Sequence, residues 1–175
     1  MIEEKLKKVI RDVPDFPKQG IIFKDISPIM LDPIISAEIL DYLVDLYKDK
    51  GITKVAGIES RGFLFGYPLA IRLGLPFVLI RKKGKLPYKK IEYSYDLEYG
   101  SATIEVHTDA ITVGDNVLIH DDLLATGGSA GAAATLVQKC GGTVAGFNFL
   151  VGLSFLKGDS ILQQFSNNIV KLVEY

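Results

Sequence analysis

A glycine turn flanked by hydroxyl residues, at positions 126–129, is the first place where this sequence could do chemistry. It follows an apolar run typical of a buried strand and precedes an alanine-rich stretch typical of a helix. Gly127 and Gly128 would let backbone N–H groups surround an anion, and Thr126 and Ser129 would add hydroxyl donors. The N-terminus of the following helix would direct its positive dipole end at that anion. The pattern predicts a phosphate-binding turn, and the alternative is a tight turn that binds nothing.

Two adjacent carboxylates, Asp121 and Asp122, come just before this turn. They would repel the same phosphate, so they suit neutral hydroxyls such as those of a ribose, or a positive charge that develops during a reaction. Ligands of open α/β sheets bind beyond the carboxyl ends of the strands, which is where the sequence places both features. The glycine spacing fits neither the Walker A pattern nor the dinucleotide-binding fingerprint.

Two further clusters of charged residues follow predicted strands. Glu59, Ser60 and Arg61 come directly after the first one, where Arg61 beside a backbone anion site would hold a diphosphate. The alternative is a helix N-terminus with a solvated arginine. Past the next strand, cations gather around Gly84; they are Arg81, Lys82, Lys83 and Lys85. Such a run is ordinarily a solvated loop, but its place beside two other anion sites favours neutralisation of substrate charge.

Apolar and aromatic side chains lie ahead of the sheet, within residues 21–25. They could stack on a flat base while backbone groups read its edge, or they could form a packed loop over the edge of the sheet. Neither His107 nor His120 has the spacing of a metal ligand, and no second cysteine supports Cys140 as one. We therefore predict no metal site built from protein ligands.

The elements that must position these residues alternate between helices and strands. Helices are predicted over residues 2–13, 33–50, 62–73 and 129–140, with Asp32 as the N-cap of the second and Gly74 closing the third. Short buried strands are predicted over residues 54–58, 76–81, 116–120, 143–151 and 169–173. This order indicates an α/β fold with a mostly parallel central sheet and helices on both faces.

Two segments interrupt the alternation. Residues 1–32 precede the first strand and cannot join the sheet simply, and Pro14, Pro17 and Gly20 predict an irregular stretch there. Residues 83–115 form a polar, tyrosine-rich insertion whose alternation at 102–106 suggests an antiparallel excursion or a lid. Within it, residues 83–100 are expected to be mobile, because they offer little apolar surface to bury.

Composition indicates one domain spanning residues 1–175, with 48% apolar and 23% charged residues. Twenty Lys and Arg against twenty-one Asp and Glu argue against a general nucleic-acid or membrane-surface binder. A single cysteine excludes an intramolecular disulfide and suits a reducing cytoplasm. The charged N-terminus does not read as a secretory signal, and no stretch is long and apolar enough to predict a membrane span.

Several stretches of the chain resemble one enzyme family. Residues 117–129, VLIHDDLLATGGS, resemble the phosphoribosyl-diphosphate-binding motif of the type I phosphoribosyltransferases. The likeness narrows to the adenine phosphoribosyltransferases at GIESRGFLFG (57–66), RKKGKLP (81–87), FPKQGIIFKDISPIM (16–30) and SYDLEYG (94–100). It covers essentially the whole chain. The sequence departs from the family at His120, where an aliphatic residue is usual, and at Ser129, where threonine is more common.

The resemblance implies transfer of the 5-phosphoribosyl group from 5-phosphoribosyl 1-diphosphate to adenine, giving AMP and diphosphate in purine salvage. It also implies Mg²⁺ carried mainly by the sugar diphosphate, and a homodimer that binds neither nucleic acid nor membrane. Two alternatives stay open. One is the same reaction on a 6-oxopurine, and the other is a non-catalytic sensor of the sugar diphosphate.

Roles for single residues also come from the resemblance. It implies three catalytic residues: Glu98, which would handle a proton near the base within a mobile loop, and Asp121 and Asp122, which would hold the ribose. A small hood within residues 1–32 would contact the base through Ile22, Phe23 and Lys24. The other implied substrate contacts are Glu59, Ser60, Arg61, Arg81, Lys82, Lys85, Tyr99 and Leu124, with Ala125, Thr126, Gly127, Gly128 and Ser129 around the 5-phosphate.

Overall fold

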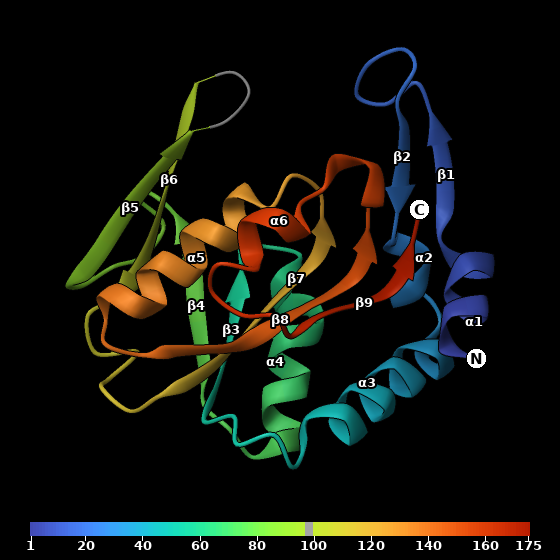
Figure 1. Cartoon of the computed structure of the whole chain (residues 1–175). Coiled ribbons are helices and arrows are strands. Elements are labelled where there is room, and N and C mark those ends of the chain that lie inside the picture. Colours follow the sequence, from blue (N-terminus) through green and yellow to red (C-terminus); the bar gives the residue numbers. More distant parts are fainter. Residues whose placement is uncertain (97–99) are drawn as a thin grey trace.

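A seven-stranded sheet forms the centre of the computed structural model, which describes residues 1–96 and 100–175 (Figure 1). The strand order is β5-β6-β4-β3-β7-β8-β9. Five strands pair in parallel: β3 (Lys54–Ile58), β4 (Phe77–Lys82), β7 (Asn116–Leu124), β8 (Thr143–Gly152) and β9 (Ile169–Glu174). The structure therefore confirms the predicted α/β fold with a mostly parallel sheet.

Helices cover both faces of this sheet, as predicted (Figure 1). One face packs against α1 (Ile2–Val9), α3 (Pro33–Tyr47) and α4 (Gly62–Leu73), and the other against α5 (Gly128–Lys139) and the short α6 (Asp159–Leu162). The predicted end signals are confirmed. The Asp32 carboxylate accepts hydrogen bonds from the N–H groups of Ile34 and Ile35, and Gly74 closes α4 with a φ of +68°.

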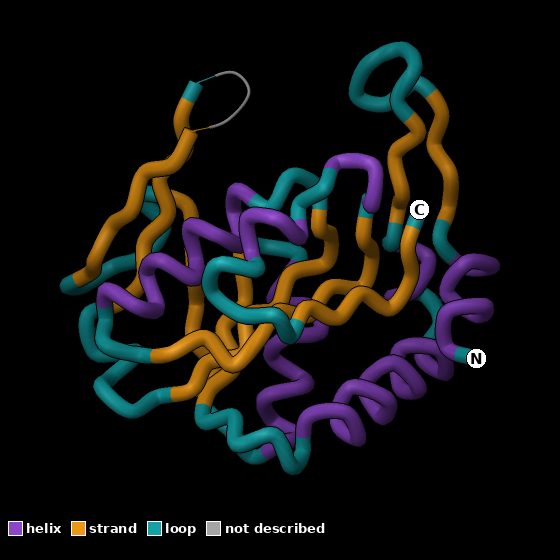
Figure 2. Tube along the Cα trace, viewed as in Figure 1, coloured by secondary structure: helices purple, strands orange, loops and turns teal. Residues whose placement is uncertain are grey.

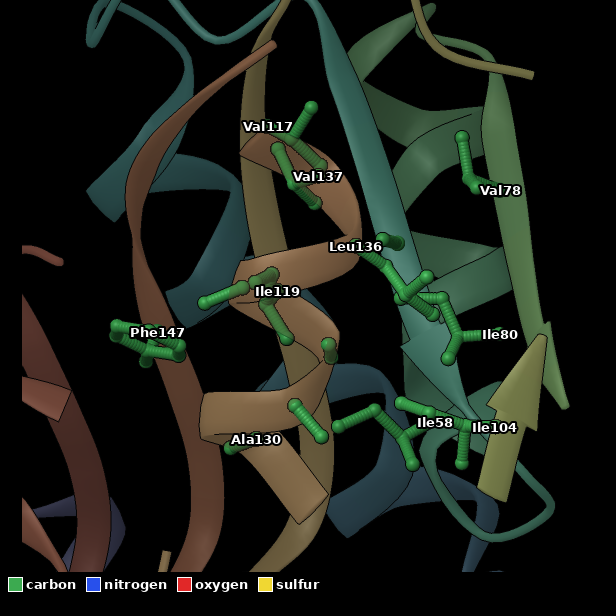
Figure 3. Packing of buried hydrophobic residues seen from close by; sticks show 14 of the residues in the cluster. Ile58, Val78, Ile80, Ile104, Val117, Ile119, Ala130, Leu136, Val137 and Phe147 are labelled. Carbon is green, nitrogen blue, oxygen red and sulfur yellow. The ribbon is translucent and has the colours of Figure 1, made fainter. Parts of the chain in front are cut away.

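The core divides into two clusters, one on each face of the sheet. Ile80, Ile119 and Leu136 lie between the sheet and α5, with Phe147 beside them (Figure 3). Leu118 belongs to the opposite cluster, under α3 and α4. Successive residues of β7 thus enter different clusters, so this strand is buried on both sides, and a slip of one residue would exchange its two faces. Each fully buried aliphatic side chain contributes about 1.5–3 kcal/mol.

The N-terminal segment forms a separate two-stranded antiparallel sheet, β1 (Arg11–Pro14) with β2 (Ile22–Asp25), followed by the short helix α2 (Ser27–Met30). This corrects two expectations. The first helix ends at Val9 rather than at residue 13, because residues 11–14 pair with β2 in extended backbone, and Pro14 also disfavours helical backbone at Val13. The stretch after it, expected to be irregular, contains β2, and β1 tolerates Pro14 because an isolated pair of edge strands accommodates a residue that cannot donate.

The polar insertion is an antiparallel hairpin, β5 (Lys90–Asp96) and β6 (Ser101–His107). β6 also pairs antiparallel with β4, so the hairpin extends the central sheet and confirms the predicted excursion. Glu98 and Tyr99 lie outside the described residues. Figure 2 shows this hairpin and the β1–β2 hairpin projecting on the same side of the molecule. No helix in the described ranges is long and apolar enough to cross a membrane.

Candidate active site

The acidic pair lies inside strand β7 and not in a loop behind it. The strand was predicted to end at His120, but β8 continues beside it, pairing Asp121 with Phe149 and Leu123 with Val151. This pairing extends regular backbone through polar residues that no apolar pattern marks as strand. Asp122 is buried, and Asp121 is partly exposed at the carboxyl end of the strand.

The glycine turn wraps around a cavity, which residues 123–130 line together with Asp121. Gly127 has a φ of +85° and caps α5, which begins at Gly128, one residue earlier than predicted. A Cβ atom added to Gly127 would lie 2.6 Å from the carbonyl oxygen of Gly158, which supports the turn from behind. The structure thus gathers six predicted contacts around one hollow at a helix N-terminus: Leu124, Ala125, Thr126, Gly127, Gly128 and Ser129.

Arg61 connects the acidic pair to the N-terminus of α4. Its Nε atom lies 2.9 Å from Oδ2 of Asp122, whose own N–H donates to Oδ1 of Asp121 at 2.9 Å. Burial and the neighbouring Asp122 carboxylate raise the pKa of Asp121 well above its usual value. Burial also raises the pKa of Asp122, while the Arg61 guanidinium opposes that rise. One cation is therefore shared by two crowded carboxylates.

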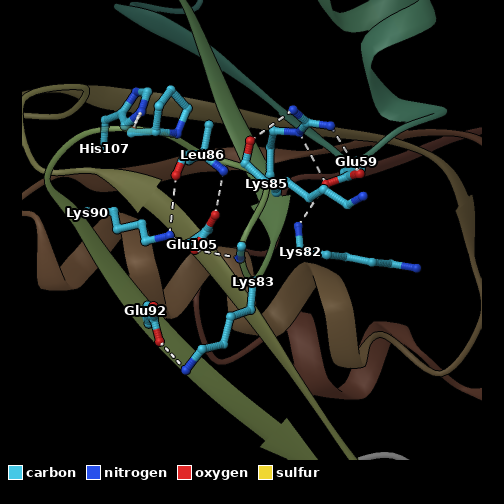
Figure 4. Close-up of polar contacts among 12 residues, drawn as sticks. Glu59, Lys82, Lys83, Lys85, Leu86, Lys90, Glu92, Glu105 and His107 are labelled. Atoms are coloured by element: carbon cyan, nitrogen blue, oxygen red, sulfur yellow. Dashed lines mark hydrogen bonds and ion pairs between the residues drawn. The ribbon is translucent and has the colours of Figure 1, made fainter.

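Two other predicted substrate contacts, Glu59 and Arg81, bind each other (Figure 4). Arg81 donates through Nε and Nη2 to the two Glu59 oxygens, each at 3.2 Å, and the Lys82 N–H donates to Oε2 at 2.8 Å. Burial raises the pKa of Glu59, but these donors outweigh it and hold the pKa below its usual value. The exposed ammonium groups of Lys82 and Lys85 have no hydrogen-bond or ion-pair partner among the described residues, so they suit an incoming anion.

Buried Glu105 anchors the loop that carries these lysines (Figure 4). The Lys90 ammonium lies 2.7 Å from Oε2, and the N–H groups of Leu86 and Gly84 donate to the carboxylate at 2.6 and 3.1 Å. Burial raises the pKa of Glu105, yet these three donors together bring it down to about 2. A charged Glu105 thus fixes the loop between β4 and β5.

Replacing Glu105 by glutamine should destabilise the protein by on the order of 3 kcal/mol at pH 7, since a pKa lowered from 4.5 to about 2 stores that much. This stability is fully present above pH 4.5 and is lost as the pH falls toward 2. Denaturant unfolding at pH 7, 5 and 3 should show the two proteins converging at low pH. Glu92→Gln, across the β5–β6 ladder in an exposed pair with Lys83, should cost less than about 1 kcal/mol. If the difference in unfolding free energy between the two proteins were the same at all three pH values, a charged Glu105 would not be what anchors the loop.

The hood residues meet the site through Phe23. The Arg61 guanidinium carbon lies 5.7 Å from the centre of its ring, within cation–π range. Ile22 is exposed on the same strand, whereas Lys24 turns elsewhere: its Nζ atom lies 2.6 Å from Asp12 and 3.7 Å from the centre of the Tyr175 ring. The structure therefore brings Phe23 to Arg61 and ties Lys24 to the hairpin and the C-terminus.

Two contacts at the site were not predicted from the sequence, and the role of His120 was left undecided. The Tyr95 and Ser129 hydroxyls form a hydrogen bond of 2.9 Å, and Gly158 supports the turn. The alternation of residues along β5 could have identified Tyr95 as facing inward, but no feature of the sequence identifies Gly158. His120 is buried and its Nδ1 atom lies 2.7 Å from Oδ1 of Asn148. Burial lowers the pKa of His120 to about 4, so it is a neutral core residue at pH 7.

Ser60, a predicted substrate contact, is exposed, and its carbonyl oxygen accepts from the Phe63 N–H.

A mostly parallel sheet with an acidic pair near the carboxyl end of a strand, followed by a glycine turn at a helix N-terminus, is typical of α/β domains that bind nucleotides or sugar phosphates. Residues 29–158 match the model of the phosphoribosyl transferase domain family. An adenine phosphoribosyltransferase of Haemophilus influenzae is 50% identical over 97% of this chain and 94% of its own. The chain belongs to the adenine phosphoribosyltransferases.

Solved structures agree with this assignment. The adenine phosphoribosyltransferase of Thermoanaerobacter pseudethanolicus is 44% identical over the whole of both chains, with a TM-score of 0.94. That of Trypanosoma brucei, described in complex with AMP, pyrophosphate and ribose-5-phosphate, is 34% identical with a TM-score of 0.89, covering 99% of this chain and 79% of its own. Within residues 1–96 and 100–175, no three acidic, histidine or cysteine residues group as a metal site would need.

Proposed function

We propose that this chain transfers the 5-phosphoribosyl group from 5-phosphoribosyl 1-diphosphate to adenine, giving AMP and diphosphate in purine salvage. The observation that carries the proposal is the glycine turn of residues 125–129, which lines a cavity and follows an acidic pair whose Asp122 is held by Arg61. Membership of the adenine phosphoribosyltransferases supports the choice of base. The ligands of the Trypanosoma relative are those we expect this chain to bind.

The substrate would lie along a continuous line of contacts. The 5-phosphate would accept from the backbone of residues 125–129 and from the Thr126 and Ser129 hydroxyls, next to Leu124. The ribose hydroxyls would donate to Asp121 and Asp122. The diphosphate would lie between Arg61 and the ammonium groups of Lys82 and Lys85, which no described residue pairs. Glu59 would hold Arg81 in place for this charge, with Ser60 contributing backbone at the start of α4.

The base would lie under the β1–β2 hairpin. Phe23 contacts Arg61, so a flat base beside Phe23 would also be near the anomeric carbon of the bound sugar. Ile22 would add apolar cover, and Lys24 would contribute backbone, because its ammonium is already paired. We propose that residues 1–32 are the hood, that residues 83–100 form the catalytic loop, and that both belong to one catalytic domain, residues 1–175.

In the reaction, the bond between C1 of the sugar and the diphosphate oxygen breaks, and N9 of adenine forms the new bond to C1. The sugar acquires oxocarbenium-like positive charge between these events. Asp121 and Asp122 would stabilise that charge more than they stabilise the resting sugar. We propose that Glu98, outside the described residues, takes the proton from the purine, with Tyr99 contacting substrate beside it.

We propose that Mg²⁺ arrives on the sugar diphosphate. Carboxylate oxygens suit this ion, but Asp122 is engaged by Arg61, which leaves the pair too few free oxygens to hold it without the substrate. When bound, the ion would supply charge neutralisation for the departing diphosphate.

We also propose a homodimer in the cytoplasm. The support is an apolar surface where α4 packs beside β4, formed by Phe63, Tyr67, Phe77 and Leu79, with Tyr67 54% exposed. It adjoins Arg61 and Arg81 along α4 and β4, so a second copy there would lie beside the diphosphate site. The one cysteine, Cys140, is unpaired, as suits a reducing compartment.

A turnover assay with adenine, hypoxanthine, guanine and xanthine tests the proposed function. We expect kcat/KM for adenine to exceed that for each 6-oxopurine by at least about 100-fold, because a site that hydrogen-bonds the exocyclic amine leaves groups unpaired on the wrong base. If a 6-oxopurine were turned over as well as adenine, that base would have to be accepted as a substrate. Binding of the sugar diphosphate without turnover of any purine would favour the sensor.

A further inference from the structure

Tyr95 connects the β5–β6 hairpin to the phosphate turn. Its hydroxyl oxygen lies 2.9 Å from Oγ of Ser129, the second residue of α5. The strand β5 packs against α5, and the two elements lie side by side in Figure 1. The Tyr95 ring also covers the turn, because two of its carbons lie 3.6 Å from the position of a Cβ atom on Gly128. The contact thus joins segments 34 residues apart.

A second tyrosine on the same strand shows that this contact is specific. Tyr93 and Tyr95 are both half-buried, and the intervening Ser94 is exposed, so the two rings share the face of β5 that meets α5. The Tyr93 ring lies under the Lys139 ammonium, at 5.0 Å, and its hydroxyl has no hydrogen bond to any described residue. Of these two hydroxyls, the one at position 95 alone reaches the phosphate turn.

Hydroxyl chemistry determines which way the hydrogen bonds must run when a phosphate is bound. A serine hydroxyl has one hydrogen to donate and lone pairs that accept, whereas phosphate oxygens mainly accept. If Ser129 donates its hydrogen to the 5-phosphate, its Oγ atom can only accept from Tyr95. The tyrosine therefore donates to the serine and the serine to the phosphate, a chain in which each hydrogen bond polarises the next.

We propose that Tyr95 is a positioning residue for the 5-phosphate, which orients the Ser129 hydroxyl toward the substrate and strengthens it as a donor. This inference rests on the proposed function, in which Ser129 binds the 5-phosphate. Tyr95 acts through Ser129 and does not itself contact the phosphate. Its effect therefore exists only while residue 129 carries a hydroxyl group.

The test is the dissociation constant of ribose 5-phosphate, measured by calorimetry for the whole chain and five variants. Tyr95→Phe removes one hydroxyl and keeps the ring, so we expect binding to weaken about three- to tenfold. Ser129→Ala should weaken it at least as much, and Tyr95→Phe added to Ser129→Ala should cause no further loss. Ser129→Thr, which keeps the hydroxyl, should restore binding. Tyr93→Phe, the matched control on the same face of β5, should bind as the parent does.

Turnover separates this role from a general weakening of the fold. Tyr95→Phe should raise KM for the sugar diphosphate and leave KM for adenine and the melting temperature unchanged. Unchanged ribose 5-phosphate binding in Tyr95→Phe, with a clear loss in Ser129→Ala, would overturn the role of Tyr95 and leave the phosphate site standing. An equal loss from Tyr95→Phe in both backgrounds would also overturn it. Unchanged binding in Ser129→Ala would remove Ser129 from the phosphate site and overturn the role of Tyr95, whereas the proposed transfer reaction is overturned only by absence of turnover in the purine assay.

Discussion

Gly127→Val should weaken AMP binding by at least about 100-fold. Valine strongly disfavours the φ of +85° found there, and its Cβ would lie 2.6 Å from the Gly158 carbonyl oxygen. Relief of both requires the turn to open, which moves the N–H groups away from the phosphate. Gly127→Ala should show a smaller loss, of about tenfold, because it lacks the branched methyl groups. Calorimetry with AMP measures both variants.

The control for this experiment is Gly114→Ala. Gly114 has a similar φ of +93°, and an added Cβ would meet nothing within 4 Å. It lies before the amino end of β7, away from the turn, so its variant should lose stability through backbone strain and bind AMP as the parent does. AMP binding within twofold of the parent in a folded Gly127→Val protein would remove the phosphate from this turn.

Asp121→Asn and Asp122→Asn should each lower kcat by about 10²–10³ and leave the dissociation constant of AMP within several-fold. The carboxylates contribute most where positive charge on the sugar is largest, in the transition state and not in the resting complex. Asp122→Asn has a second consequence. It leaves Arg61 without its carboxylate partner, so diphosphate should bind that variant at least as tightly as it binds the parent.

Asp115→Asn provides the matched control for these kinetics. Asp115 is also a buried aspartate beside a cation, with Lys54 at 3.0 Å, but it precedes β7 at the other end of the strand. Its loss should reduce stability and leave kcat per folded molecule unchanged. Parent-like kcat in both Asp121→Asn and Asp122→Asn would make the acidic pair structural.

The sequence predicted those elements whose residues carry a clear periodicity. The strands β3, β4, β8 and β9 and the helices α3 and α4 lie within a few residues of their expected positions, since buried apolar runs and strong end signals coincide there. β1 was predicted as the end of the first helix, because Val13 continues the apolar spacing of that helix, and β2 was missed because a four-residue strand after Pro17 and Gly20 follows turn signals. β7 extends beyond its apolar run, because its partner β8 and not its own pattern keeps the chain extended.

The site was predictable in its residue types but not in its pairings. The acidic pair and the glycine turn are close in sequence, on one connection from a strand to a helix, so the sequence alone places them together. The pairing of Arg81 with Glu59 spans 22 residues, and that of Tyr95 with Ser129 spans 34, so only the folded chain shows that Glu59 restrains Arg81 and that Tyr95 contacts Ser129. Lys24 shows the same limit, since its partner Asp12 lies across a hairpin that the sequence did not reveal.

The support that Gly158 gives to the phosphate turn bears on how this turn could be transplanted. An added Cβ at Gly158 would lie 2.3 Å from the Ala125 carbonyl oxygen and 3.1 Å from the Gly127 nitrogen, so each glycine leaves room for the other. Residues 117–129 therefore do not form the complete binding motif by themselves. Grafted into another α/β scaffold, they would need a glycine-bearing segment placed behind the turn, and a search for the binding motif along the sequence alone would overlook that segment.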